Sequence, residues 1–250
     1  MNHDVKFQLQ SEEYVFPYHH LIDFENINFS KSWAYGIEYY FYSSEILNLL
    51  KNKSFQSIAD IGCGDGKIAL EIARLYNNKI IYGFDIESRS INFAKSFNCN
   101  TKNVYFYNED FNNFKFNFDI IVLNEVLEHI PQDEIKIFVK NCFDKLNKYG
   151  EIIISVPSLN IKNIPEKHYK HYEESELFKD VGEYFDIKEL KFVYKKNLLI
   201  TIIEKLLLNK IFCIIDKKLI KIAVTILKNL QKSTNKKNGR HIIAVLRKKD

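Results

Sequence analysis

The stretch from Ser57 to Ala69 limits the fold of this chain more than any other. An apolar run that contains one acid, Asp60, leads into glycines at every second position, Gly62, Gly64 and Gly66. Apolar residues then recur at the spacing of a helix. The pattern predicts a strand, a tight turn and a helix, which is how a nucleotide-binding βαβ unit begins. Glycine is required where a ligand approaches the backbone more closely than a Cβ atom permits.

The spacing of these glycines differs from that of a dinucleotide-binding turn. A dinucleotide fingerprint reads G-x-G-x-x-G and holds a pyrophosphate at the helix N-terminus. Here the turn reads G-x-G-x-G, and Asp60 and Asp65 flank it. Two carboxylates repel a pyrophosphate but suit a ligand that carries an ammonium group. A strand-to-helix turn without a ligand is the alternative interpretation of this motif taken alone.

The segment from Asp60 to Gly66 resembles motif I of the class I S-adenosylmethionine (SAM) dependent methyltransferases, and it matches their acid-x-G-x-G-x-G pattern at each fixed position. The resemblance implies SAM as cofactor and S-adenosylhomocysteine as product. It also implies that Asp60, Gly62 and Gly64 hold the methionine end of SAM, with Cys63 in the same site.

Two later segments extend this expectation. A second strand over residues 79–84 ends at Asp85, about 20 residues after the glycines, where an acid can bind both ribose hydroxyls. Ile86 is suited to lie against the adenine. A helix N-cap for residues 87–97 explains an acid here equally well on local grounds. After a third strand over residues 103–107, the resemblance implies that Asp110 bonds the adenine amino group and Phe111 packs on the ring; a simple polar turn is the alternative.

The fourth strand, expected over residues 118–123, leads into a segment that borders the reaction centre, because ligands of open α/β sheets bind at the carboxyl ends of the strands. The sequence from Asp119 to Pro131 resembles motif IV of the ubiquinone-biosynthesis O-methyltransferase branch. Asn124 and Glu125 are therefore expected in the cofactor site.

Histidines gather in the segments expected around one pocket. A hydroxyl acceptor loses its proton during methyl transfer, and histidine has a suitable pKa for accepting it near neutral pH. The candidate catalytic histidines are His129, His168, His171, His19 and His20, the first three ranked above the last two. Each of them alone is more often a polar surface residue than a base.

A metal-dependent alternative stays open. Glu125, Glu128 and His129 have i, i+3 and i+4 spacing, so in a helix they would share one face. The small-RNA 3′-terminal 2′-O-methyltransferases carry a similar E-x-x-E-H segment and bind magnesium. We expect no metal, since magnesium prefers oxygen ligands. The alternatives are thus a magnesium-dependent RNA 3′-end 2′-O-methyltransferase and a non-catalytic SAM-binding protein.

The whole pattern predicts a single α/β domain with a Rossmann-like, doubly wound, seven-stranded sheet whose last strand is antiparallel. The remaining strands are expected over residues 150–156, 186–194 and 241–247, with helices over 35–50, 132–146 and 173–184. The expected parts are an N-terminal lid over 1–54, a core over 55–194, a basic amphipathic helical insertion over 195–239 and a last strand over 240–250.

The charge is unevenly distributed. Residues 195–250 carry 15 Lys and Arg against 3 Asp and Glu, a net charge of +12, so the rest of this +4 chain carries −8. An acidic body does not predict a nucleic-acid partner. The insertion is expected to cover the acceptor pocket; contact of residues 198–230 with an anionic membrane surface, or dimerisation, are the other interpretations. The oligomeric state stays open.

The compartment and the acceptor complete the expectation. The four cysteines, Cys63, Cys99, Cys142 and Cys213, form no C-x-x-C pair and indicate a reducing compartment. With neither a signal peptide nor a membrane span evident, we expect a cytoplasmic protein. The expected reaction is O-methylation of a small polar acceptor, such as a sugar, phosphorylated or nucleotide-linked precursor used in cell-envelope polysaccharide biosynthesis.

Overall fold

The computed structural model describes residues 3–12, 14, 34–98, 100–207 and 216–249. They form one seven-stranded sheet in the order β3-β2-β1-β4-β5-β7-β6. The strands are β1 (Ser57–Ile61), β2 (Ile80–Phe84), β3 (Val104–Tyr107), β4 (Phe118–Asn124), β5 (Leu146–Pro157), β6 (Phe185–Val193) and β7 (His241–Lys248). The first five run parallel, and β7 lies antiparallel between β5 and β6. The predicted fold class, including the antiparallel last strand, is confirmed.

Helices cover both faces of the sheet. They are α1 (His3–Glu12), α2 (Ala34–Leu50), α3 (Lys67–Leu75), α4 (Ser88–Phe97), α5 (Ile135–Asp144), α6 (Glu174–Val181), α7 (Leu198–Leu207) and α8 (Lys217–Gln231), with short 3₁₀ turns at Phe111–Asn113 and Leu127–His129. Alternate residues of β4 point to opposite faces, as a period of two requires. Ile120 and Val122 join the cluster that contains α2, α3 and α4, whereas Ile121 and Leu123 join the cluster with α5 and α6.

Two boundaries differ from the predicted ones for identifiable reasons. The helix expected over 132–146 is shorter, because Leu146 pairs with Phe118 and begins β5 four residues before the expected start. The helix expected over 173–184 begins after Glu173, which caps it through a reciprocal hydrogen-bond pair with Glu176.

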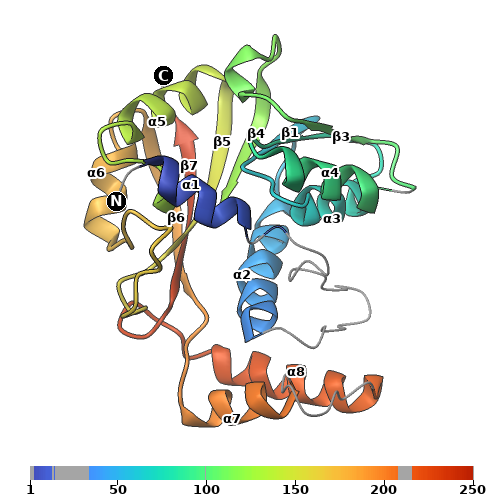
Figure 1. Cartoon of the computed structure of the whole chain (residues 1–250), viewed down its shortest axis with the longest axis vertical. Helices are drawn as coiled ribbons and strands as arrows, with labels where there is room; N and C mark the ends of the chain where they lie inside the picture. Colours follow the sequence, from blue (N-terminus) through green and yellow to red (C-terminus); the bar gives the residue numbers. More distant parts are fainter. Residues whose placement is uncertain (1–2, 13, 15–33, 99, 208–215, 250) are drawn as a thin grey trace.

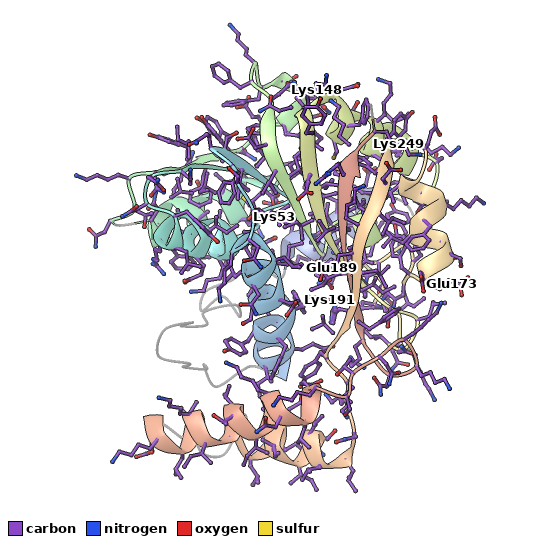
Figure 2. The ribbon with its side chains drawn as sticks, turned by 180° about the vertical axis from the view of Figure 1, so that it is seen from behind. Lys53, Lys148, Glu173, Glu189, Lys191 and Lys249 are labelled. Atoms are coloured by element: carbon purple, nitrogen blue, oxygen red, sulfur yellow. The ribbon has the colours of Figure 1, made fainter. Side chains whose placement is uncertain are left out.

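The N-terminal and inserted helices lie in different places. In Figure 1, α1 lies across the sheet, whereas α7 and α8 lie together below α2, away from α5. The helix α2 packs as a core element, with Ile37, Ile46 and Leu50 fully buried. On the rear side, Glu189 and Lys191 of β6 lie beside α2, and Lys191 pairs with Glu45 of that helix at 2.7 Å (Figure 2). Among the described residues, no helix combines the length and apolar character needed to cross a membrane.

Candidate active site

The glycine turn after β1 requires glycine for both backbone conformation and space. Gly62 has a φ of +70° and Gly66 a φ of +75°, a region that L side chains rarely adopt. A Cβ atom at Gly62 would lie 2.7 Å from a methyl carbon of Val126, and one at Gly66 would lie 2.5 Å from the ring of Phe106. The turn therefore packs closely against the segment after β4 and against β3.

Asp85 connects this turn to the end of β2. One carboxylate oxygen accepts a hydrogen bond from the Gly64 N–H at 2.8 Å, and the other accepts one from the Glu87 N–H at 2.8 Å. The alternative role as cap of α4 falls instead to Glu87, whose side chain accepts from the Arg89 N–H. Each carboxylate oxygen can accept a second hydrogen bond, so Asp85 can still bind two hydroxyls. Burial raises the pKa of Asp85.

Asp60 and Asp65 each present a buried oxygen to the site. The Oδ2 atoms of both have no hydrogen-bond partner among the residues that the structure describes. Burial, together with neighbouring carboxylates, raises the pKa of Asp60 to about 8, and burial raises that of Asp65 to about 7. Orphaned buried carboxylate oxygens of this kind fit a cationic group such as the ammonium of SAM.

Two cavities open from this region. The first, of about 520 Å³, is lined by Asp85, Ile86, Asp110 and Phe111, together with Gly62. The side chain of Asp110 accepts from the Asn112 N–H at 2.8 Å, and Phe111 is buried. The second cavity, of about 670 Å³, is lined by the other residues predicted for the cofactor, Asp60, Cys63, Gly64 and Asn124.

The two cavities share a short set of residues: Gln10, Gly62, Glu125, His129 and Lys167. His129 therefore lies where the cavities meet. His168 and His171 line the second cavity only. His19 and His20, also predicted as catalytic candidates, lie outside the described residues.

The segment after β4 does not form the helix on which Glu125, Glu128 and His129 would share a face. Glu125 has a left-handed φ of +58°, and only Leu127–His129 form a 3₁₀ turn. The Glu125 N–H donates to the Ser155 carbonyl at 3.1 Å, and the Ser155 hydroxyl lies 2.9 Å from Glu125 Oε1. Glu125 is thereby directed toward β5. A strained non-glycine residue beside a cavity is a frequent sign of a functional site.

A buried charged network adjoins the second cavity. His241 lies between two carboxylates, with Nδ1 3.1 Å from Glu125 and Nε2 3.0 Å from Glu38, and Arg240 donates to Glu38 at 2.6 Å. Burial alone would lower the pKa of His241, but Glu125 and Glu38 raise it to about 10. Burial alone would raise the pKa of Glu38, but its bonds to His241 and Arg240 lower it to about 2.

Sequence reasoning missed Glu38, Arg240 and His241. A usable signal was present: an antiparallel last strand begins at the carboxyl edge of its parallel neighbours, and His241 pairs with Pro157 at the end of β5. The first residue of that strand therefore had to lie near the site.

Two of the clustered histidines, His129 and His168, lie close to a buried acid, Glu128. The ring centroids of His129 and His168 are 4.7 Å apart, and those of His168 and His171 are 5.2 Å apart. Burial lowers the pKa of His129 to about 3 and that of His168 to about 2, so both imidazoles are neutral at pH 7. Burial, with the nearby Glu125 charge, raises the pKa of Glu128 well above its usual range.

The inserted helices take no part in the lining. No described residue of α7 or α8 lines either cavity. Residues 208–215 of the insertion lie outside the described residues, so the expectation that the insertion covers the acceptor pocket stays a prediction. These helices pack against α2 instead, with Ile200, Ile220 and Val224 buried in its cluster. The helix α1 contributes Lys6, Phe7, Gln10 and Ser11 to the lining of the first cavity, and Gln10 also lines the second.

Comparison with known proteins decides the family. A family model described as a methyltransferase domain matches residues 52–247. The chain belongs to the methyltransferase domain family. The release factor glutamine methyltransferases of two Buchnera aphidicola strains are 36% identical over 130 residues and 37% identical over 95 residues. These matches cover 50% and 37% of this methyltransferase, and 45% and 34% of the relatives, so the chain matches less than half the length of those proteins.

Solved structures share the fold of this methyltransferase. N-methyltransferase NodS from Bradyrhizobium japonicum WM9, solved in complex with S-adenosylhomocysteine, has a TM-score of 0.64 at 14% identity and covers 98% of this chain and 99% of its own. A SAM-dependent methyltransferase from Archaeoglobus fulgidus has a TM-score of 0.56 at 19% identity, with 83% and 93% covered. At these identities the likeness establishes the fold alone.

Proposed function

We propose that this methyltransferase uses SAM to methylate a hydroxyl group of a small polar acceptor. The observation that carries the proposal is the meeting of two cavities at His129. In this proposal the first cavity holds adenosine, with Asp85 on the ribose and with Asp110, Phe111 and Ile86 around the adenine. Asp60, Asp65 and the glycine turn, with Cys63, Asn124 and Glu125, hold the methionine end.

The chemistry requires alignment and removal of a proton. Methyl transfer from a sulfonium is an in-line displacement, so the residues must align the acceptor oxygen with the methyl group and exclude water. When bound, SAM supplies the activated methyl group. The imidazoles of His129 and His168 are neutral, so in this proposal a ring-nitrogen lone pair accepts a hydrogen bond from the acceptor hydroxyl, with His171 behind them. Their lowered pKa values make both imidazoles weak bases.

The second cavity favours a polar acceptor. Arg240, Lys167 and four histidines line it together with Asn163. Cations and hydrogen-bonding groups of this kind suit a hydroxylated, phosphorylated or nucleotide-linked sugar, and a precursor of the cell envelope in the cytoplasm is our first candidate. From the resemblance of the segment Asp119 to Pro131, we also propose that this methyltransferase is related to the ubiquinone-biosynthesis O-methyltransferase branch.

A protein acceptor is the second candidate, favoured by the likeness to release factor glutamine methyltransferases. One assay separates the two: release of S-adenosylhomocysteine with a panel of sugar phosphates and nucleotide sugars, against a purified bacterial release factor. Turnover with the first group alone supports the hydroxyl acceptor. Turnover with the protein alone replaces it, and no turnover with either contradicts both.

The inserted helices carry a separate proposal. Exposed aliphatic side chains on α7 and α8 include Leu198, Ile202, Ile222 and Ile226, and lysines such as Lys205, Lys218 and Lys221 are exposed beside them. Aliphatic and cationic side chains together suit an anionic membrane surface. We therefore propose that residues 198–230 make peripheral contact with such a surface.

A further inference from the structure

The carboxylate of Glu128 is fully buried beside the second cavity, and neither of its oxygens has a hydrogen-bond partner among the residues that the structure describes. Its Oε1 lies 3.9 Å from Nε2 of His129. Removing a carboxylate from water without hydrogen bonds is costly, so this position needs either a bound proton or a cation that completes it.

Hydrogen bonds fix which nitrogen of each neighbouring histidine is free. Nδ1 of His129 lies 3.3 Å from the Lys167 carbonyl, and Nδ1 of His171 lies 3.1 Å from the Ile161 carbonyl. A carbonyl only accepts, so both Nδ1 atoms carry the hydrogen and both Nε2 atoms keep a lone pair. Nε2 of His171 then accepts from Nδ1 of His168 at 3.1 Å, which leaves Nε2 of His168 with a lone pair as well.

Ligand atoms of Glu128, His129 and His168 converge. One such atom from each residue lies within 4.8 Å of the others. Zinc binds histidine nitrogen and carboxylate oxygen at about 2.0–2.2 Å in tetrahedral geometry, which places two of its ligands about 3.3–3.6 Å apart. Side-chain movements of about 1.5 Å or less would bring the three atoms into range of one ion.

We propose that Glu128, His129 and His168 hold a divalent transition metal, with Zn²⁺ as the preferred ion. Two imidazoles and one carboxylate suit zinc or a neighbouring first-row ion, whereas magnesium prefers oxygen ligands. The carbonyls of Lys167 and Ile161, the latter acting through His171, orient the two imidazoles, as outer partners do in zinc sites. Glu125 is not a ligand, because it bonds to Ser155 and His241.

The sequence predicts no metal, and the alternative was a magnesium site that included Glu125. The site proposed here differs from both. Its role in catalysis depends on the proposed function; its occupancy does not. With both Nε2 lone pairs engaged, the histidines would activate the acceptor hydroxyl by holding the ion that coordinates it. The hydroxyl proton, made more acidic by coordination, would then leave to water.

Metal binding is measured on the full chain without SAM or acceptor, so its outcome is independent of the methyltransferase assay. The protein is purified with its affinity tag removed, stripped with EDTA and dialysed against Zn²⁺, and bound metal is measured by mass spectrometry and chelator competition. We expect one zinc ion per chain that millimolar Mg²⁺ does not displace. The Co²⁺-loaded protein should show visible absorption bands of a site with nitrogen ligands.

Variants distinguish the metal ligands from the residue that orients one of them, His171. Glu128→Gln and His168→Asn should weaken zinc binding by about a hundredfold or more, and His171→Asn by about tenfold. Glu166→Gln is the control: it makes the same Glu-to-Gln change on an exposed carboxylate in the loop that carries His168, and it should leave the affinity for zinc unaltered. Circular dichroism checks that each variant is folded. No bound zinc in the wild type, or equal affinity in Glu128→Gln, overturns the proposal and makes Glu128 a neutral buried acid.

Discussion

The network around Glu38 gives a prediction whose size and pH dependence both follow from its contacts. Glu38 accepts hydrogen bonds from Arg240 at 2.6 Å and from His241 at 3.0 Å, and its side chain is about nine-tenths buried. Glu38→Gln removes the charge while keeping the shape. Breaking a buried ion pair by removing one partner costs about 3–5 kcal/mol.

The lower end of that range applies here, because 23% of the Arg240 side chain reaches solvent and Glu125 still faces His241 in the variant. We expect a loss of about 3 kcal/mol at pH 6, or a melting temperature lower by about 6–12 °C for a domain of this size. Glu45→Gln is the matched control on the same helix. Its partner Lys191 is 41% exposed, and such pairs contribute at most about 1 kcal/mol.

The pH profile tests the cause. The pKa of Glu38 is lowered from 4.5 to about 2, so its stabilisation is present above pH 4.5 and is lost as the pH falls toward 2. The pKa of His241 is raised from 6.5 to about 10, so its stabilisation is present below pH 6.5 and is lost as the pH rises toward 10. The gap between wild type and Glu38→Gln should be largest between pH 4.5 and 6.5.

Urea unfolding followed by circular dichroism at several pH values measures this gap. The reasoning is refuted if Glu38→Gln loses no more stability than Glu45→Gln, or if the gap widens between pH 7 and 9.

Three further predictions address the turn, the cofactor and the insertion. Gly62→Ala should lower the free energy of unfolding in urea by about 2–4 kcal/mol, because Gly62 has a positive φ and a Cβ atom there would lie 2.7 Å from Val126. An unchanged free energy of unfolding would contradict the packing described. The affinity for SAM should rise with pH through the range 6–8, and binding should release protons, because a cationic ligand favours the ionised forms of Asp60 and Asp65. Calorimetry in buffers of different ionisation enthalpy measures the proton release. An affinity that does not change with pH would argue against contact of these two carboxylates with the ammonium group. Lys218→Glu together with Lys221→Glu should reduce co-sedimentation with phosphatidylserine vesicles, and absence of wild-type binding would remove that proposal.

Local patterns predicted the sheet well because each parallel strand is a short apolar run followed by a polar or glycine-rich turn. Asp85 was proposed because it ends a predicted strand about 20 residues after the glycines, whereas Asp110 was proposed from the resemblance to a known family. Their arrangement around one cavity follows from strand order, which the resemblance to a known family supplied.

Contacts between residues that are far apart in the sequence were not predicted. Nothing near Glu38 in the sequence indicates that it meets His241, 203 residues later, at a distance of 3.0 Å. The i, i+3, i+4 spacing of Glu125, Glu128 and His129 suggested one helical face, but the left-handed backbone at Glu125 directs its side chain to Ser155. The position of α7 and α8 also depends on packing with α2, for which their amphipathic pattern gives no partner.

Calorimetric titration with S-adenosylhomocysteine tests the central claim most directly. We expect saturable binding to the wild type, and binding weakened by about tenfold to a hundredfold in Asp85→Asn, because hydrogen bonds to a charged group contribute about 1.5–3 kcal/mol. Asp186→Asn, at an exposed position of β6, should bind like the wild type. No heat with the wild type, or equal affinity in Asp85→Asn, would contradict the assignment of this crevice to SAM.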